Sequence, residues 1–251
     1  TCLGAALAYT VKLNNLTGTE PRFFTLNLGP SNIARKSTAI DLCKNFFEQL
    51  DCIKGKDDGA TNFCLGVASG EGLLQQLTKH KNTTIYYDEI KLLVQKASIE
   101  GASLLPHMST LFEKHEAENV TKGHALRVKN VRLSLLAAST TETYETLFNK
   151  EFLNIGFPNR IWLVVDSPTE SIPMTEPVDP VLFQNFIWRM NIVLDRYAKG
   201  TLLSLAPDAR EAWNTWYHAR PKTESSRRLE TYGERLMLIL AVDHEETVIT
   251  K

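Results

Sequence analysis

The sequence predicts an α/β protein with a mainly parallel sheet, and two observations carry that prediction. Short apolar segments typical of strands alternate along the chain with segments whose apolar residues recur at helical spacing. The strand segments are apolar along most of their length, as in a sheet that helices cover on both faces. We expect an α/β core over residues 1–166, a proline-rich linker over 167–180 and an all-helical subdomain over 181–251.

Each element follows from a local pattern. Residues 22–28 read RFFTLNL, a strand-forming run, and residues 37–50 place Ile40, Cys43 and Leu50 on one helical face. By the same criteria, the other expected strands cover residues 63–68, 83–87, 132–138 and 161–165. The other expected helices cover residues 4–13, 70–79, 90–97, 104–114, 144–153, 181–198, 207–219 and 225–242.

Composition narrows the class of protein. The chain has 251 residues, 43% of them hydrophobic and 23% charged, which is typical of a soluble globular protein. No apolar run approaches the roughly 20 residues that span a bilayer, and no secretory signal is present, so we expect a cytoplasmic protein without membrane contact. The formal net charge of −1 excludes a uniformly basic, nucleic-acid-coating surface. The chain begins at Thr1 rather than at methionine, as a piece of a longer protein would.

The segment between the first core strand and the next helix has the residues of a phosphate-binding loop. Residues 29–38 read GPSNIARKST, so a turn containing glycine leads into a helix that opens on Lys36. In such loops backbone amides and a lysine hold a nucleotide polyphosphate, and a hydroxyl binds magnesium. The spacing departs from G-x-x-x-x-G-K-[ST], because Arg35 replaces the second glycine and Gly29 lies one residue too far upstream. The segment predicts nucleotide binding.

An acidic pair follows the strand predicted over residues 83–87. Asp88 at such a strand end could hold a magnesium ion, and Glu89 could polarise the water that attacks a γ-phosphate. The structural alternative is that the two acids favour the start of the following helix. Sheet topology favours the catalytic interpretation, because the carboxyl ends of parallel strands meet at one edge.

Two later segments offer candidate catalytic residues. Ser139-Thr140-Thr141 ends a strand, where a hydroxyl could orient water or sense the γ-phosphate, although an N-cap is an equal alternative. Arg160 precedes the last core strand and could stabilise a neighbouring subunit's phosphate in the transition state. An ordinary surface arginine beside a turn is the alternative there.

Basic and aromatic residues suggest further contacts. The segment 121–132, a hairpin or loop, contains no acid and could contact a nucleic-acid backbone, or simply be solvated. Its basic residues are Lys122, Arg127, Lys129 and Arg132. Trp213 and Trp216 in the C-terminal helices are interpreted as core rather than as a base-stacking platform. Arg228 and Arg235 are candidates for a lid arginine that touches the bound nucleotide.

The chain resembles a broad family of P-loop ATPases. The resemblance lies in five sequence blocks taken together, which read GPSNIARKSTAI, YYDE, SLLAASTT, GFPNR-IWLVV and AREAWNTWY…YGERLMLILAV. The family occurs in plasmids, phages and other mobile elements, often fused to or encoded beside a primase. The resemblance covers roughly residues 6–242. In that family the loop commonly reads G-P-S-G-x-x-R-K-S-T, so an arginine before the lysine is normal, whereas Asn32 stands where a glycine is usual.

The resemblance implies magnesium-dependent ATP hydrolysis by a helicase-like module of the AAA+/RecA type. It further implies a homo-oligomeric ring that acts on single-stranded DNA in replication of a mobile element, with a primase as a possible partner. Its roles fall on the loop residues Gly29, Ser31, Arg35, Lys36, Ser37 and Thr38, on the acidic pair Asp88 and Glu89, on Thr140 as sensor and on Arg160 as finger. Lys36 would bind the β- and γ-phosphates, and Ser37 or Thr38 with Asp88 would hold magnesium.

Two other functions stay open at this point. The chain could be a nucleotide-binding assembly platform with little or no turnover. It could also be a small-molecule kinase, although Glu89 argues against this because kinases exclude water rather than activate it.

Overall fold

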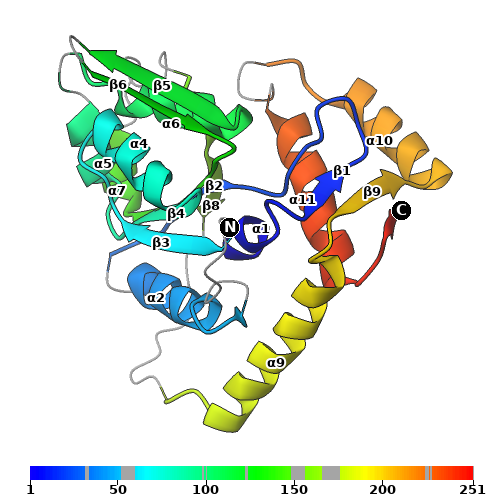
Figure 1. Ribbon diagram of the computed structural model, residues 1–251. Coiled ribbons are helices and arrows are strands. Elements are labelled where there is room, and N and C mark those ends of the chain that lie inside the picture. Colours follow the sequence, from blue (N-terminus) through cyan, green and yellow to red (C-terminus); the bar gives the residue numbers. More distant parts are fainter. Residues whose placement is uncertain are drawn as a thin grey trace.

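The fold is built around a five-stranded parallel sheet with the strand order β3-β4-β7-β2-β8 (Figure 1). A computed structural model describes residues 1–31, 34–51, 60–97, 99, 101–121, 124–147, 156–165, 176–223, 226 and 228–250. The strands of this sheet are β2 (Phe24–Leu28), β3 (Thr61–Leu65), β4 (Asn82–Tyr87), β7 (Arg132–Ser139) and β8 (Trp162–Val165). The α/β class with a mainly parallel sheet, predicted from the sequence, is therefore confirmed.

The sheet is buried because helices cover both of its faces. Along β7, Leu133, Leu135 and Ala137 enter one apolar core, whereas Leu136 and Ala138 enter a second one, as the two-residue period of a strand requires. The helices of the first core are α4 (Gly70–Lys79), α5 (Lys91–Ala97) and α6 (Leu104–Glu113). Those of the second are α1 (Cys2–Ala6) and α2 (Lys36–Phe47), on the other side of the sheet (Figure 1).

Local sequence explains where α4 begins. The hydroxyl of Ser69 accepts a hydrogen bond from the amide of Gly72 at 3.0 Å, which caps the helix. Leu73, Leu74 and Leu77 then form a fully buried stripe at helical spacing. The predicted bounds of this helix, 70–79, are confirmed because cap and stripe are both local signals.

A second, smaller sheet corrects two expectations. It is parallel, with the order β1-β9-β10, and consists of β1 (Val11–Leu13), β9 (Thr201–Leu205) and β10 (Val248–Ile249). The expected helix over residues 4–13 ends at Ala6, and the C-terminal part is not all-helical. Both errors have one cause: these strands are stabilised by partners far away in the sequence, which local patterns do not reveal.

The remaining helices lie mainly on the C-terminal side of the molecule (Figure 1). They are α7 (Thr141–Leu147), α9 (Pro180–Tyr197), α10 (Pro207–Ala219) and α11 (Leu229–Asp243). The last three match the predicted C-terminal helices closely, while residues 167–175 of the predicted linker lie outside the described part of the chain. Because β1 pairs with β9, an N-terminal strand of the predicted core belongs to the same sheet as C-terminal strands. None of the described helices is long and apolar enough to cross a bilayer.

A buried ionic cluster holds the amino-terminal edge of the main sheet together. Glu20, 3% exposed, accepts hydrogen bonds from Arg132 Nη2 at 2.7 Å and from Arg22 Nε at 3.1 Å. Arg22 also donates to the carbonyl of Leu133 at 3.1 Å. Arg235 donates to the carbonyl of Arg22 at 2.5 Å, so α11 is fixed to the same cluster. Glu20 offsets part of the positive charge of these arginines, and backbone carbonyls accept further hydrogen bonds from Arg22 and Arg235.

Acidification is expected to destabilise the fold through His115. Burial lowers the pKa of His115 to about 4, although its Nε2 lies 3.6 Å from Glu20. The unfolded chain, with an ordinary histidine pKa near 6.5, therefore binds the proton first as the pH falls. Stability should decline between about pH 6.5 and 4 and should be independent of this group above that range.

Chemical denaturation of the wild type and of His115→Gln across this pH range checks the prediction. The variant should show a flatter dependence, and His218→Gln, at an exposed position, should keep the wild-type slope. An unchanged slope in His115→Gln would contradict the assignment.

Candidate functional site

Three strands bring candidate residues to one edge of the main sheet. β7 lies between β4 and β2, and all three run in the same direction. In register, Tyr87 pairs with Ala137, and Ser139 pairs with Leu28. The acidic pair after β4, the hydroxyls after β7 and the β2–α2 loop (residues 29–35) therefore share the carboxyl edge, where ligands bind in open parallel sheets.

The β2–α2 loop has Lys36 folded over it. Lys36 is the first residue of α2, and its Nζ donates to the carbonyls of Gly29 at 2.8 Å and Pro30 at 3.1 Å. The lysine charge is thus at the mouth of the loop. Ser37 and Thr38, also at the start of α2, are exposed, so their hydroxyls face solvent at the positively polarised end of a 12-residue helix.

Arg35 explains part of the departure from the usual motif. Its φ and ψ are 43° and 37°, so the position directly before the lysine adopts the left-handed conformation. Glycine adopts this conformation without steric cost, which is why a glycine is usual there. Arg35 has an exposed side chain, as does Ser31, while Asn32 lies outside the described residues.

The acidic pair is directed toward β7. Ser139 Oγ donates to Glu89 Oε1 at 2.8 Å, and the Ile90 amide donates to the Ala138 carbonyl at 2.9 Å. Glu89 is half-buried, whereas Asp88 is exposed. Two strand spacings of about 4.8 Å separate β4 from β2, so the acids lie about 10 Å across the edge from the β2–α2 loop.

Among the three hydroxyl residues that end β7, Ser139 contacts the acidic pair, whereas the sequence analysis favoured Thr140. Thr140, which we expected to be the sensor, accepts a hydrogen bond from the Thr143 amide at 3.1 Å and caps α7. Thr140 therefore serves as an N-cap, the structural alternative stated for this segment. Ser139 is 1% exposed and is hydrogen-bonded to Glu89 instead. The register of β7 against β4 could have indicated this residue, but register is not readable from one strand alone.

The arginine candidates lie at the opposite edge of the sheet. Arg160 ends the short helix η1 (Pro158–Arg160), and the pairing of Trp162 with Thr25 places it level with Phe23. At about 3.3 Å per residue, this level is about 20 Å from Gly29. At that distance Arg160 does not reach the β2–α2 loop of its own chain, and its action on a neighbouring copy stays a prediction.

The prediction that Arg228 and Arg235 are lid arginines is wrong, because both lie at the edge of the sheet opposite the β2–α2 loop. Arg235 is 4% exposed and donates to the carbonyls of Arg22 and Phe112, so it stabilises the core. Burial lowers its pKa to about 9. Arg228 precedes α11 at the same edge and forms an ion pair with Glu113. Neither side chain lies near the β2–α2 loop.

The basic residues that were predicted to contact a nucleic acid differ in their exposure to solvent. The hairpin of β5 (Glu116–Thr121) and β6 (His124–Lys129) confirms the hairpin alternative for this region. Lys129 is exposed, and Arg127 pairs with Glu116 at the surface at 3.1 Å. Arg132 is 3% exposed and bound to Glu20, so it cannot contact a nucleic acid. Lys122 lies outside the described residues.

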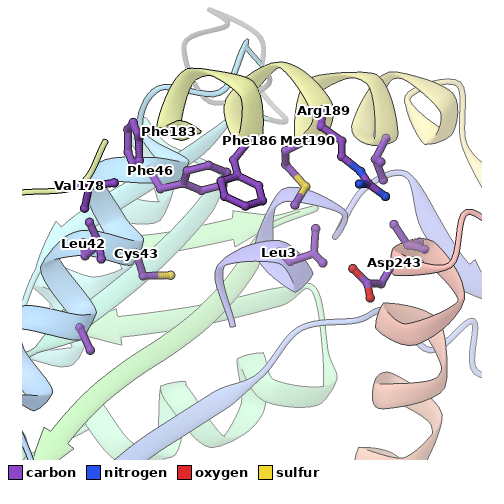
Figure 2. A pocket seen from close by; sticks show the side chains of 13 residues that line it. Leu3, Leu42, Cys43, Phe46, Val178, Phe183, Phe186, Arg189, Met190 and Asp243 are labelled. Carbon is purple, nitrogen blue, oxygen red and sulfur yellow. The ribbon is translucent and has the colours of Figure 1, made fainter. Parts of the chain in front are cut away.

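A groove of about 640 Å³ runs between α2 and α9 (Figure 2). Its lining is mainly apolar and includes Leu42, Cys43, Phe46, Phe183, Phe186 and Met190. Arg189 and Asp243 lie at one end of the view in Figure 2. The groove also includes Ala39, one helical turn beyond Lys36, so it is close to the β2–α2 loop but chemically unsuited to phosphate. A flat apolar group such as a nucleotide base suits it better.

The side chains at the carboxyl edge of the sheet include oxygen ligands of the kind that magnesium binds. Ser37 offers a hydroxyl and Asp88 a carboxylate, both exposed, and such oxygen ligands with phosphate oxygens are what magnesium prefers. Within the described part of the chain, no three His, Cys, Asp or Glu side chains gather into a metal site.

Comparison with known proteins does not assign a family. No family model matches the sequence, and a search of curated proteins finds no match either.

Proposed function

We propose that the chain binds ATP at the β2–α2 loop and hydrolyses it with magnesium. The observation that carries the proposal is the convergence, at one edge of the sheet, of Lys36 on its loop and the Ser139–Glu89 pair. The family resemblance of the loop, the acidic pair and Arg160 supports the same function. The groove beside α2 offers a place for the base.

The residues have distinct tasks in this mechanism. Lys36 exchanges the carbonyls of Gly29 and Pro30 for β- and γ-phosphate oxygens, which are stronger partners for its charge. Ser37 and Asp88 would hold a magnesium ion, which when bound would neutralise charge on the phosphates. Ser139 fixes the carboxylate of Glu89, which orients a water molecule toward the γ-phosphorus.

The reaction consumes one water molecule. A bond forms between the water oxygen and the γ-phosphorus, and the bond from that phosphorus to the β–γ bridging oxygen breaks. ADP leaves with the electron pair of that bond, and the proton from water passes by way of Glu89 to solvent. The products are ADP, inorganic phosphate and a proton.

We further propose, from the resemblance, that turnover drives a helicase-like module on single-stranded DNA in the replication of a mobile element. The exposed Lys129 and the surface pair Arg127–Glu116 leave the β5–β6 hairpin as the candidate contact. A nucleotide-binding platform with little turnover is the alternative, motivated by Asn32, which stands where a glycine is usual in the loop.

Phosphate release from ATP with magnesium, measured with and without single-stranded DNA, tests the proposal. Steady turnover that DNA accelerates is the expected result. ATP binding without phosphate release would favour the platform, and transfer of labelled γ-phosphate to a small metabolite would favour a kinase. Absence of ATP binding would overturn the proposed function.

A further inference from the structure

Two cysteines from different helices meet beside the groove between α2 and α9. Cys2 is the first residue of α1, and Cys43 lies in the second half of α2. Their thiols are hydrogen-bonded to each other, with Cys2 as the donor. Both are free thiols, and α1 packs directly against α2. Residues 3–42 separate them along the chain, so the fold creates this pair rather than sequence proximity.

The two thiols differ in their access to solvent. Cys2 is 3% exposed and belongs to the second apolar core. Cys43 is half-buried and lines the 640 Å³ groove. Figure 2 shows its sulfur directed from α2 toward the side of the groove where Leu3, the neighbour of Cys2, lies. A small reagent that enters the groove therefore meets Cys43, whereas Cys2 is shielded.

Their hydrogen bond makes Cys43 the more acidic of the two. The donation from Cys2 lowers the pKa of Cys43 below the usual value for a thiol, although burial opposes this effect. The same hydrogen bond raises the pKa of Cys2, and burial raises it further. Because the thiolate is the nucleophilic form of cysteine, Cys43 has the properties of the attacking sulfur, and Cys2 keeps its proton.

Cys64 provides an internal comparison. It is half-buried, as Cys43 is, but its Sγ is itself a donor, to the carbonyl of Gly66 at 3.3 Å. Burial raises the pKa of Cys64. Partial exposure alone therefore does not make a thiol acidic in this protein, and the contact with Cys2 sets Cys43 apart.

The main sheet holds Cys2 in place for a reaction with Cys43. Asn82 Nδ2 of β4 donates to the carbonyl of Ala5 at 2.9 Å, which fixes α1 on the sheet. Two thiols already in hydrogen-bonding contact need only small side-chain rotations to reach disulfide geometry. A disulfide here would link α2, the helix that begins at Lys36, to the anchored helix α1.

We propose that Cys43 is a site of reversible oxidation by hydroperoxides, and that Cys2 converts the oxidised sulfur into a disulfide within the same chain. The groove admits the peroxide to Cys43, and the buried Cys2 receives only the sulfur that it already contacts. The inference is independent of the proposed ATP hydrolysis, since it requires no nucleotide.

The oxidation consumes one peroxide and two thiols. The Cys43 thiolate attacks one peroxide oxygen, so a sulfur–oxygen bond forms and the oxygen–oxygen bond breaks. The leaving oxygen departs with the electron pair and takes up a proton, which leaves a sulfenic acid on Cys43. The sulfur of Cys2 then attacks that of Cys43, and the hydroxyl leaves as water with the proton of Cys2. Peroxide gains two electrons, and the two thiols lose them.

Intact mass and peptide mapping of the full chain test the proposal. The folded protein is treated with about one equivalent of hydrogen peroxide, and the remaining thiols are then blocked in denaturant. The expected product has lost two hydrogen atoms and contains one disulfide, between Cys2 and Cys43. It should melt several degrees higher than the reduced chain, because the cross-link closes a long loop, and dithiothreitol should reverse the shift.

Three variants separate the roles of the two sulfurs. Cys2→Ser keeps a hydrogen-bond donor but cannot form the disulfide, so a sulfenic acid on Cys43 should persist and react with a 1,3-diketone probe. Cys43→Ser should yield neither product. Cys64→Ser is the matched control and should form the disulfide as the wild type does. If a variant fails to fold, the disulfide map of the wild type decides alone.

Several results would overturn the inference. One is peroxide treatment that leaves both thiols reduced. Another is a disulfide to Cys64, or to Cys52, which lies outside the described residues. A third is Cys43 oxidised to the sulfinic acid without a bond to Cys2. A melting temperature lowered by the Cys2–Cys43 disulfide would also count against it, because the bond would then strain the fold. A chain that neither binds nor hydrolyses ATP would leave the inference standing.

Discussion

Replacing Glu20 by glutamine is expected to lower the free energy of unfolding by about 3–5 kcal/mol, the usual cost of removing one partner from a buried ion pair. Glu20 is the carboxylate between Arg22 and Arg132, and both guanidinium groups are almost fully buried. Glutamine keeps the size but loses the charge, so the two arginines, with Arg235 nearby, would be left uncompensated. Urea denaturation at pH 7 measures the difference.

Glu116→Gln is the matched control. It also removes an arginine partner, Arg127, but both side chains are about half exposed, so the expected loss is below about 1 kcal/mol. Equal stability losses in the two variants would contradict the importance of the buried cluster for the fold.

Replacing Glu89 by glutamine is expected to lower ATP turnover by about 10²–10⁴-fold, the range for loss of a general base. Glutamine can still accept the hydrogen bond from Ser139, so the local structure should be kept. It cannot take up the water proton. ATP affinity should change little if, as proposed, the β2–α2 loop holds the phosphates. Phosphate release and calorimetric ATP binding, measured on the same preparation, separate the two effects.

Two companion variants sharpen this prediction. Ser139→Ala should reduce turnover less than Glu89→Gln, since it frees the carboxylate without removing it. Glu48→Gln, which loses a surface pair with Lys44 on α2, should match the wild type. Turnover of Glu89→Gln within twofold of the wild type would exclude Glu89 as the base.

The main sheet could be predicted from sequence because its strands are rich in apolar and β-branched residues and its helices have local signals. Ser69 and the leucines of α4 are one example. The strands β1 and β9 were not predicted, because each is short and is stabilised by pairing with a strand about 190 residues away along the chain. Sequence alone favoured a helix for residues 4–13, and only the partner strand explains why Val11–Leu13 is extended.

The candidate site divides in the same way. The loop motif after β2 indicated Lys36 as a candidate, and the acidic pair was indicated because it directly follows β4. Which edge an arginine occupies depends on strand register and helix direction, so Arg228 and Arg235 were assigned to the wrong edge. Ser139 was passed over in favour of Thr140 because adjacent residues at a strand end point in different directions, and sequence does not say which one faces the neighbouring strand.

The central claim is that Lys36 holds nucleotide phosphates. Calorimetric titration with ATP and magnesium, applied to the wild type, Lys36→Ala and Lys44→Ala, tests it most directly. Lys44 lies on the same helix but pairs with Glu48, so its replacement serves as the control for loss of a lysine charge. The wild type and Lys44→Ala should bind ATP alike, and Lys36→Ala should bind at least about 10-fold more weakly, since a charge-assisted hydrogen bond contributes about 1.5–3 kcal/mol. Equal ATP affinity in all three proteins, or no binding by any of them, would contradict the claim.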